Sequence, residues 1–310
     1  MKRGQNTRRG NVSRLSLQQR IEAAIKRPYS YGEPIRGHRS FNWVQDLKSK
    51  WVHAYNDPDF ISKTVGNPIL KSLKGSTGKR VVVDFCGGEG LVSNVLQDFL
   101  NKNGVNASVI NLDLSSRNLF AHQKSRREKQ GKGIPVRADA IQSPLPENAV
   151  DAASIRYGMH YFPKEGQISL LKEMFRALKP AATLVVYHPD HHSTEAPHVR
   201  AMSVASGIPY EERKKENYFP TRREFTGMAK SAGFRVKSVE EVARHWYSPE
   251  SYADRWGGDS GDERQRISNA VSEIFQQAAK ERAYKKQFRR TKSGTLLKPG
   301  HHVVFVLRKP

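Results

Sequence analysis

Residues 81–90, Val-Val-Val-Asp-Phe-Cys-Gly-Gly-Glu-Gly, decide the fold of this chain. Three consecutive β-branched residues predict a buried strand, and the glycines after them predict a tight turn. Residues 91–100 follow with apolar side chains at helical spacing. A strand, a glycine-rich turn and a helix N-terminus form the usual binding site for a nucleotide-like ligand in an α/β sheet.

Two acidic residues narrow the choice of ligand. Asp84 ends the predicted strand and Glu89 lies inside the turn. A pyrophosphate at this turn would meet both carboxylates, and like charges at close range repel. The turn also departs from the dinucleotide fingerprint, which requires Gly or Ala where Ser93 stands. S-adenosylmethionine has a sulfonium and an amino group and no phosphate, so the two acids favour it over NAD or FAD.

Further strands end in acids that suit the same ligand. Residues 107–113 predict a second strand ending in Asp113, at about the distance from the glycines where a carboxylate binds a ribose diol. Residues 134–140 predict a third strand whose Asp139, or the backbone beside it, accepts a hydrogen bond from the adenine amino group. Residues 150–155 and 183–187 predict a fourth and a fifth strand, with an amphipathic helix at 168–178 between them.

In this order and spacing, these segments resemble the class I S-adenosylmethionine-dependent methyltransferases over roughly residues 50–310. The resemblance implies an α/β fold with a doubly wound, seven-stranded, mostly parallel sheet. It places the methyltransferase domain at residues 41–310 and a substrate-covering insert at residues 188–220. The chain departs from the family in two places. Cys86 replaces the first glycine of the turn, and Ala181-Ala182 replaces a glycine pair.

The resemblance and the motifs together define a predicted cofactor site. An aromatic residue before the first strand lines the pocket in the family, and Tyr55 is the best match; packing of Tyr55 on the sheet is the competing interpretation, because aromatic side chains usually supply packing area. The predicted cofactor-binding residues are Asp84, Cys86, Gly88, Gly90, Asp113, Leu114, Asp139, Ala140, Arg156 and Tyr55.

The predicted acceptor site follows the fourth and fifth strands, where ligands of α/β sheets bind. His160, Tyr161 and His188 lie there, and an imidazole near neutral pKa suits a general base. The competing interpretation makes them pocket-wall or core residues. Although His188, Asp190, His191 and His192 cluster in sequence, adjacent histidines rarely face one ion together, so no metal is predicted.

Two absences narrow the acceptor chemistry. The tetrapeptide after the fourth strand reads Ile-Arg-Tyr-Gly rather than Asn- or Asp-Pro-Pro-aromatic, which disfavours base amino methylation. The single cysteine, Cys86, lies in the cofactor turn, which excludes a cytosine-C5 enzyme with a nucleophilic cysteine.

Charge is the second strong signal. The 310 residues have a formal net charge of +23, which is typical of a protein with a polyanionic partner such as RNA or a ribonucleoprotein; a solvated basic surface is the competing interpretation. Residues 1–21 contain six basic residues and no acid, and residues 1–40 are therefore predicted to be a basic arm or a targeting segment. The predicted location is cytoplasmic. If residues 1–21 are a transit peptide, the predicted location is mitochondrial. No apolar run approaches the roughly 20 residues of a membrane span.

The sequence therefore predicts a methyltransferase that uses S-adenosylmethionine, with a small molecule or RNA as the acceptor. The alternative is a non-catalytic RNA- or ribosome-binding protein that reuses the same fold. The intact acids and glycines of the turn favour retained cofactor binding, and they do not distinguish the two functions.

Overall fold

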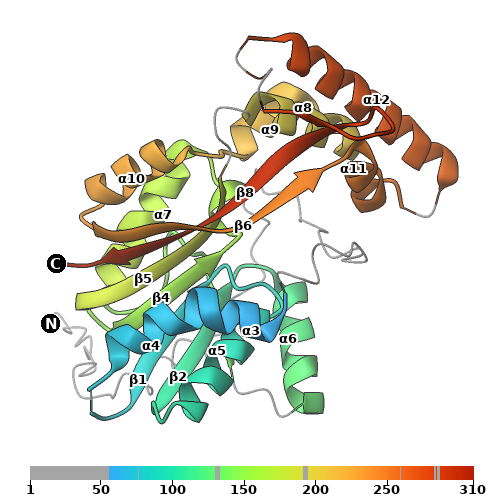
Figure 1. Ribbon diagram of the computed structural model, residues 1–310. Coiled ribbons are helices and arrows are strands. Elements are labelled where there is room, and N and C mark those ends of the chain that lie inside the picture. The colour runs from blue at the N-terminus through green and yellow to red at the C-terminus, as the bar shows by residue number, and fades with distance from the viewer. Residues whose placement is uncertain are drawn as a thin grey trace, which may run out of the picture.

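One mixed β-sheet organises the chain (Figure 1). The structure is a computed structural model, and it describes residues 56–75, 77–129, 133–190, 195–258, 260–282, 284 and 287–310. The predicted arm at residues 1–40 and Tyr55 lie outside these residues. The strands are β1 (Arg80–Phe85), β2 (Ala107–Asp113), β3 (Ile134–Arg137), β4 (Val150–Arg156), β5 (Leu178–Asp190), β6 (Arg235–Tyr247), β7 (Arg289–Arg290) and β8 (Leu296–Arg308).

The strand order confirms the predicted fold class. The main path of the sheet runs β3-β2-β1-β4-β5-β8-β6, and β7 pairs with β8 beside it. Strands β1 to β5 are parallel, whereas β8 runs antiparallel between β5 and β6. The order reverses at β1 and β4, and open α/β sheets bind ligands at such a switch point, outside the carboxyl ends of the strands.

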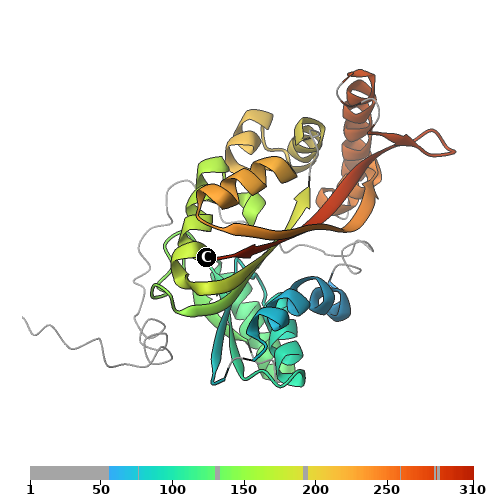
Figure 2. The ribbon, with the colours of Figure 1, turned by 60° about the vertical axis from the view of Figure 1, so that its left-hand side comes forward.

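Two hydrophobic layers cover the sheet because β1 alternates its side chains between the faces. Val82 packs with Leu96 of α5 (Leu91–Lys102) and Ile69 of α4 (Asn67–Leu73). Val83 belongs to the hydrophobic cluster on the other face, which includes Leu170 of α7 (Lys164–Ala177) and Met228 of α10 (Arg222–Ser231). Figures 1 and 2 show these helices on opposite sides of the sheet.

Shorter elements complete this layer arrangement. Helix α3 (Pro58–Ile61) and a π-helical turn at Ser62–Gly66 precede α4, and α6 (Ser116–Lys129) follows β2. A 3₁₀ turn at Met159–Tyr161 follows β4. None of the helices in the described ranges is both long and apolar enough to cross a membrane.

A third hydrophobic core lies beyond the sheet and belongs to a unit that we call the cap. The cap comprises α8 (Glu195–Ser206), α9 (Tyr210–Glu216), α11 (Pro249–Trp256) and α12 (Gly261–Lys280), with the segment 217–221. Its core includes Met202, Phe219 and Phe275. Strands β6 and β8 continue together past Asp190, the last paired residue of β5, and the cap helices gather at this end in Figure 1.

The cap contains other segments of the chain than the predicted insert at residues 188–220. Strand β5 continues to Asp190, so residues 188–190 belong to the sheet, and α8 and α9 occupy much of the rest of the predicted insert. Helices α11 and α12 come from residues 249–280, which the sequence did not associate with this region. That the cap covers an acceptor stays a prediction.

Candidate functional site

The turn between β1 and α5 has a left-handed backbone at alternate residues. The φ angles are 53° at Cys86, 55° at Gly88 and 81° at Gly90. A Cβ on Gly90 would overlap the ring of His122, whereas a Cβ on Gly88 would meet nothing closer than 3.9 Å, at Asn118 Nδ2. Gly90 is therefore required by packing, while the free side of Gly88 is open to a ligand.

Hydrogen bonds from the end of β2 hold this turn in place. The Gly88 amide donates to Asp113 Oδ2 at 2.9 Å, and Asn111 Nδ2 donates to the Gly88 carbonyl at 2.9 Å. Asn111 also lies 2.9 Å from His122 Nδ1. Gly88 and Asp113, predicted separately, are thus in direct contact. Asn111 and His122 were not among the predicted site residues; the one available signal was a polar amide among the apolar residues Val109, Ile110 and Leu112.

A buried carboxyl group lies under the turn. Asp84 is 0% exposed, and its Oδ1 accepts a hydrogen bond from Ser154 Oγ at 2.7 Å. Burial raises the pKa of Asp84 from 3.8 to about 7, although the Ser154 hydrogen bond and the charge of Arg156 oppose the shift. Arg156 donates to Asn56 Oδ1 at 3.0 Å and lies 4.8 Å from the centre of the Tyr157 ring.

Two buried acceptor atoms flank Gly87 without a hydrogen-bond donor among the described residues. They are Asp84 Oδ2 and Asn111 Oδ1, and a Cβ on Gly87 would overlap both. Buried acceptors of this kind need a donor, from a ligand or from a proton on Asp84. Burial also raises the pKa of the Cys86 thiol, and the charges of Asp113, Asp84 and Asp139 add to the effect.

This local chemistry fits a cationic, donor-rich group and disfavours a phosphate. The acids around the turn repel an anion, and the orphaned acceptors require hydrogen-bond donors. The amino group and sulfonium of S-adenosylmethionine meet both conditions. The turn residues present therefore fit this cofactor.

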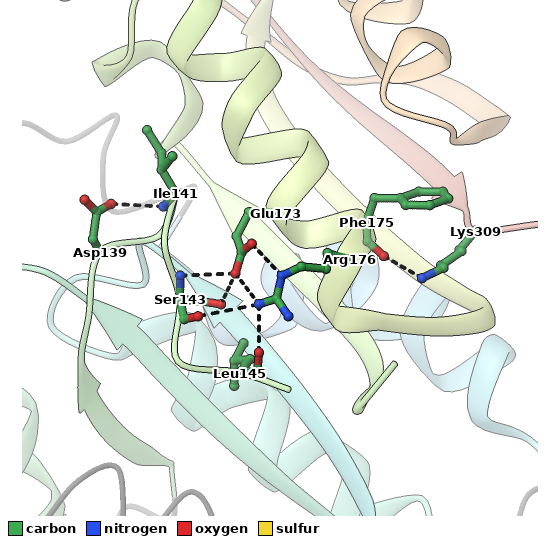
Figure 3. Close-up of polar contacts among 8 residues, drawn as sticks. All are labelled: Asp139, Ile141, Ser143, Leu145, Glu173, Phe175, Arg176 and Lys309. Atoms are coloured by element: carbon green, nitrogen blue, oxygen red, sulfur yellow. Dashed lines mark hydrogen bonds and ion pairs between the residues drawn. The ribbon is translucent and has the colours of Figure 1, made fainter. Parts of the chain in front are cut away.

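The loop after β3 is held in place by α7 (Figure 3). Asp139 Oδ1 accepts from the Ile141 amide at 2.9 Å. Farther along the loop, Ser143 Oγ donates to Glu173 Oε1 at 2.5 Å, and Arg176 donates to the Leu145 carbonyl at 2.7 Å. Of the two remaining predicted cofactor residues, Leu114 is 40% exposed and Ala140 is buried. The Ala138 amide donates to the Asp113 carbonyl at 3.1 Å, so this loop begins beside the end of β2.

The predicted acceptor residues lie close to one another. His160 and His188 are both buried, and their ring centres are 6.2 Å apart in an edge-to-face arrangement. The Tyr161 ring is 4.2 Å from that of His160, and Phe219 from the cap stacks on His160 at 5.1 Å. Residues of two strand ends and the cap thus meet at one place.

Both imidazoles are neutral at physiological pH. Burial lowers the pKa of His160 well below 6.5 and that of His188 to about 4, although the Pro189 carbonyl opposes the second shift. His160 Nδ1 and His188 Nε2 are buried and have no hydrogen-bond partner in the part of the chain that the structure describes. Burial raises the pKa of Tyr161, which keeps its phenol protonated. A neutral imidazole with a free lone pair can accept a proton.

A separate depression of about 320 Å³ lies at the amino-terminal ends of β1 and β2, opposite to the glycine-rich turn. It is lined by residues from the end of α4, from the loop between α4 and β1 and from the loop between α5 and β2, including Leu73, Gly78 and Asn106. None of the predicted site residues borders it, and it has no part in the site described above.

The sheet order, with one antiparallel strand beside β5, and the acid-ringed turn define a class I methyltransferase fold. Residues 82–181 match the family model described as a methyltransferase domain. This part of the chain is therefore a class I S-adenosylmethionine-dependent methyltransferase domain.

Curated relatives match only part of the chain. The demethylmenaquinone methyltransferase of Bacillus licheniformis is 24% identical over 170 residues, which cover 55% of this chain and 62% of that protein. The ubiquinone/menaquinone biosynthesis C-methyltransferase UbiE of Neisseria meningitidis is 32% identical over 106 residues, or 34% of this chain and 41% of that protein. The match thus spans less than two thirds of either relative.

Solved structures support the fold over a longer range. One solved structure is of a protein from Bacillus halodurans C-125 that has been assigned only provisionally as a methyltransferase. Its TM-score is 0.61 at 18% identity, and the match covers 81% of this chain and 99% of that one. The [4+2]-cyclase SpnF has a TM-score of 0.53 at 15% identity, covering 86% and 85%. Because one of these proteins is a cyclase, the fold alone does not define the reaction.

Proposed function

We propose that this protein is an S-adenosylmethionine-dependent methyltransferase that acts on a small-molecule acceptor. The observation that carries the proposal is the turn after β1, where an open Gly88 is hydrogen bonded to Asp113 above the buried Asp84. This arrangement joins backbone access to negative charge, which suits a cationic nucleoside.

The predicted cofactor residues take separate roles in this proposal. Asp113, whose carboxylate already accepts from the Gly88 and Ser115 amides, would accept from the ribose hydroxyls. Asp139 and Ala140 would face the adenine, with Leu114 beside them. Asp84, steadied by Ser154 and by the charge of Arg156, would neutralise the positive end of the cofactor. Cys86 and Gly90 would shape the turn, and Tyr55 would close the pocket.

His160, Tyr161 and His188 would serve the acceptor. Bound S-adenosylmethionine supplies an activated methyl group on a sulfonium, so the protein has to orient the acceptor and remove its proton. The nitrogen of His160 or His188 that has no hydrogen-bond partner among the described residues would take that proton. The protonated phenol of Tyr161 would donate a hydrogen bond to the acceptor.

Calorimetric titration tests the cofactor assignment. The wild-type protein should bind S-adenosylmethionine and S-adenosylhomocysteine and should bind NAD more weakly. Asp113→Ala should weaken the binding of S-adenosylmethionine at least about tenfold, because charge-assisted hydrogen bonds to the ribose are lost. Tighter binding of NAD than of S-adenosylhomocysteine, or an unchanged affinity in the variant, would overturn the assignment.

A second candidate function, RNA binding, rests on the net charge of +23. If about half of the six basic residues in 1–21 contact phosphates, removing that segment should lower the log–log salt slope on single-stranded RNA by about two. Fluorescence anisotropy of the full-length and truncated proteins measures both slopes. Equal slopes would assign the segment to targeting, and a fluorescent fusion with and without residues 1–21 would then distinguish a cytoplasmic from a mitochondrial address.

A further inference from the structure

The cap places a buried guanidinium next to the acceptor residues. Arg213 of α9 is 0% exposed and donates to Asn217 Oδ1 at 3.3 Å and to Ser206 Oγ at 2.5 Å. Asn217 in turn donates to the carbonyl of His160 at 3.0 Å. Arg213 is thus connected to the backbone of His160 through the side chain of Asn217.

A second guanidinium, that of Arg255 in α11, affects the pKa values of His160 and Tyr161. It is exposed, lies 4.8 Å from the centre of the Trp256 ring, and borders a small opening together with His198 and Tyr252. The charges of Arg255 and Arg213 oppose the effect of burial on the pKa of Tyr161. The charge of Arg255 also adds to the effect of burial that lowers the pKa of His160. His198 lines the same opening as Arg255 and lies 5.4 Å from the ring of Phe219, which stacks on His160, so two rings separate this opening from His160.

Lys298 of β8 adds a third basic side chain on the cap side. It is 0% exposed, its Nζ donates to the Pro299 carbonyl at 3.1 Å, and it lies 5.7 Å from the centre of the Tyr247 ring. Within the described ranges, no carboxylate forms an ion pair with it. Burial of an ammonium group without an acid is unfavourable, which here lowers the pKa of Lys298 to about 7.

Aromatic contacts join this lysine to the acceptor residues. The ring of Tyr247 lies 5.4 Å from that of His198, and His198 lies 5.4 Å from Phe219, which stacks on His160. The cofactor side of the same region is acidic, because Asp84, Asp113 and Asp139 surround the turn. The acceptor site therefore has negative charge on its cofactor side and positive charge on its cap side.

We propose that the acceptor carries an anionic group, a carboxylate or a phosphate, which binds on the cap side in the field of Arg255 and Arg213. This inference rests on the proposed methyltransferase function and adds the chemical class of the acceptor. A negative group drawn toward the cap would turn the opposite end of the acceptor, with its nucleophilic atom, toward the methyl donor and the two neutral imidazoles. The charge distribution would thereby orient the acceptor before reaction.

The test measures how charge affects binding to the protein saturated with S-adenosylhomocysteine. The probes are 4-hydroxybenzoate, phenyl phosphate and the neutral 4-hydroxybenzamide, titrated by calorimetry. At least one anion should bind about tenfold or more tightly than the amide, because a charge-assisted contact replaces a neutral one. Comparison of the two anions distinguishes a carboxylate site from a phosphate site.

Matched variants localise the effect. Arg255→Gln should abolish most of the preference for the anion, and Arg255→Lys should restore part of it. Arg266→Gln removes the same charge from an exposed arginine of α12 and should leave the preference unchanged. Arg213→Lys keeps the buried charge and alters the hydrogen bonds of the guanidinium, so it should retain most of the preference for the anion.

The outcomes distinguish a failure of the proposed methyltransferase function from a failure of the anionic acceptor. Failure to bind S-adenosylhomocysteine would overturn the proposed function itself. Normal binding of S-adenosylhomocysteine with no binding of either anion, or with the amide bound equally well, would overturn only the anionic acceptor. Equal effects of Arg255→Gln and Arg266→Gln would show that net charge, and not the site, attracts the probes, and this too would overturn it.

Discussion

Replacement of Asp84 by asparagine should stabilise the protein while it weakens binding of the cofactor. The Asp84 carboxyl is wholly buried, and its Oδ2 has no donor among the described residues. Asparagine has nearly the same shape and keeps an oxygen for the hydrogen bond from Ser154. Its amide group would also supply a donor beside Asn111 Oδ1, which lacks one in the described part of the chain.

The size of the effect follows from the shift of the pKa. The pKa of Asp84 rises from 3.8 to about 7 on folding, so the ionised carboxylate disfavours the folded state. Below pH 3.8 the carboxyl is protonated in both states and the penalty is absent. The penalty grows as the pH rises toward 7 and is complete above it. At about 1.4 kcal/mol per pKa unit, it reaches about 2 kcal/mol at pH 5 and about 4 kcal/mol at pH 8.

Urea denaturation of both proteins without cofactor, at pH 5 and pH 8, measures this difference. Asp84→Asn should gain stability over the wild type at both pH values, and its gain should be about 2 kcal/mol larger at pH 8. Ser154→Ala is the control, because it removes the hydrogen bond that favours the carboxylate and should destabilise the protein most at pH 8. A gain from Asp84→Asn that is the same at both pH values would refute a titrating buried carboxyl.

The turn and the acceptor residues give three further predictions. Gly88→Ala should weaken binding of S-adenosylmethionine and lower the free energy of unfolding by about 1–2 kcal/mol, because the backbone at this position is left-handed. Gly90→Ala has the same backbone strain and also displaces His122, so it should lower the free energy of unfolding further in urea denaturation. Cys86→Gly should be neutral or stabilising by up to about 1 kcal/mol, because glycine tolerates the φ of 53°; a clear loss of stability would assign a packing role to the cysteine. If His188 accepts the proton, kcat of the Asp84→Asn variant, which lacks the carboxyl that titrates near pH 7, should stay constant above pH 5 and fall as the pH drops through about 4; a kcat of this variant that fell already between pH 8 and pH 6 would exclude His188.

Local sequence determined the sheet and the turn. Residues 107–113 were predicted as a strand and form β2 over Ala107–Asp113, and the predicted helix after the glycines is α5. These segments were readable because strand and helix periodicity is a property of neighbouring residues. The same reasoning was less accurate where an element extends past its apolar run: β5 was predicted at residues 183–187 and spans Leu178–Asp190.

Tertiary structure decided the interactions among residues distant in sequence. No spacing rule indicates that His122 fills the space beside Gly90, or that Asn111 holds the Gly88 carbonyl. The depressed pKa values of His160 and His188 come from burial, which depends on how the cap and strand ends meet. The cap joins α8 and α9 to α11 and α12, across the whole of α10 and β6. Sequence therefore specified the glycine-rich turn after β1, where adjacent residues act together, and only the fold assembled the cluster of His160, Tyr161 and His188, where the contacts are long-range.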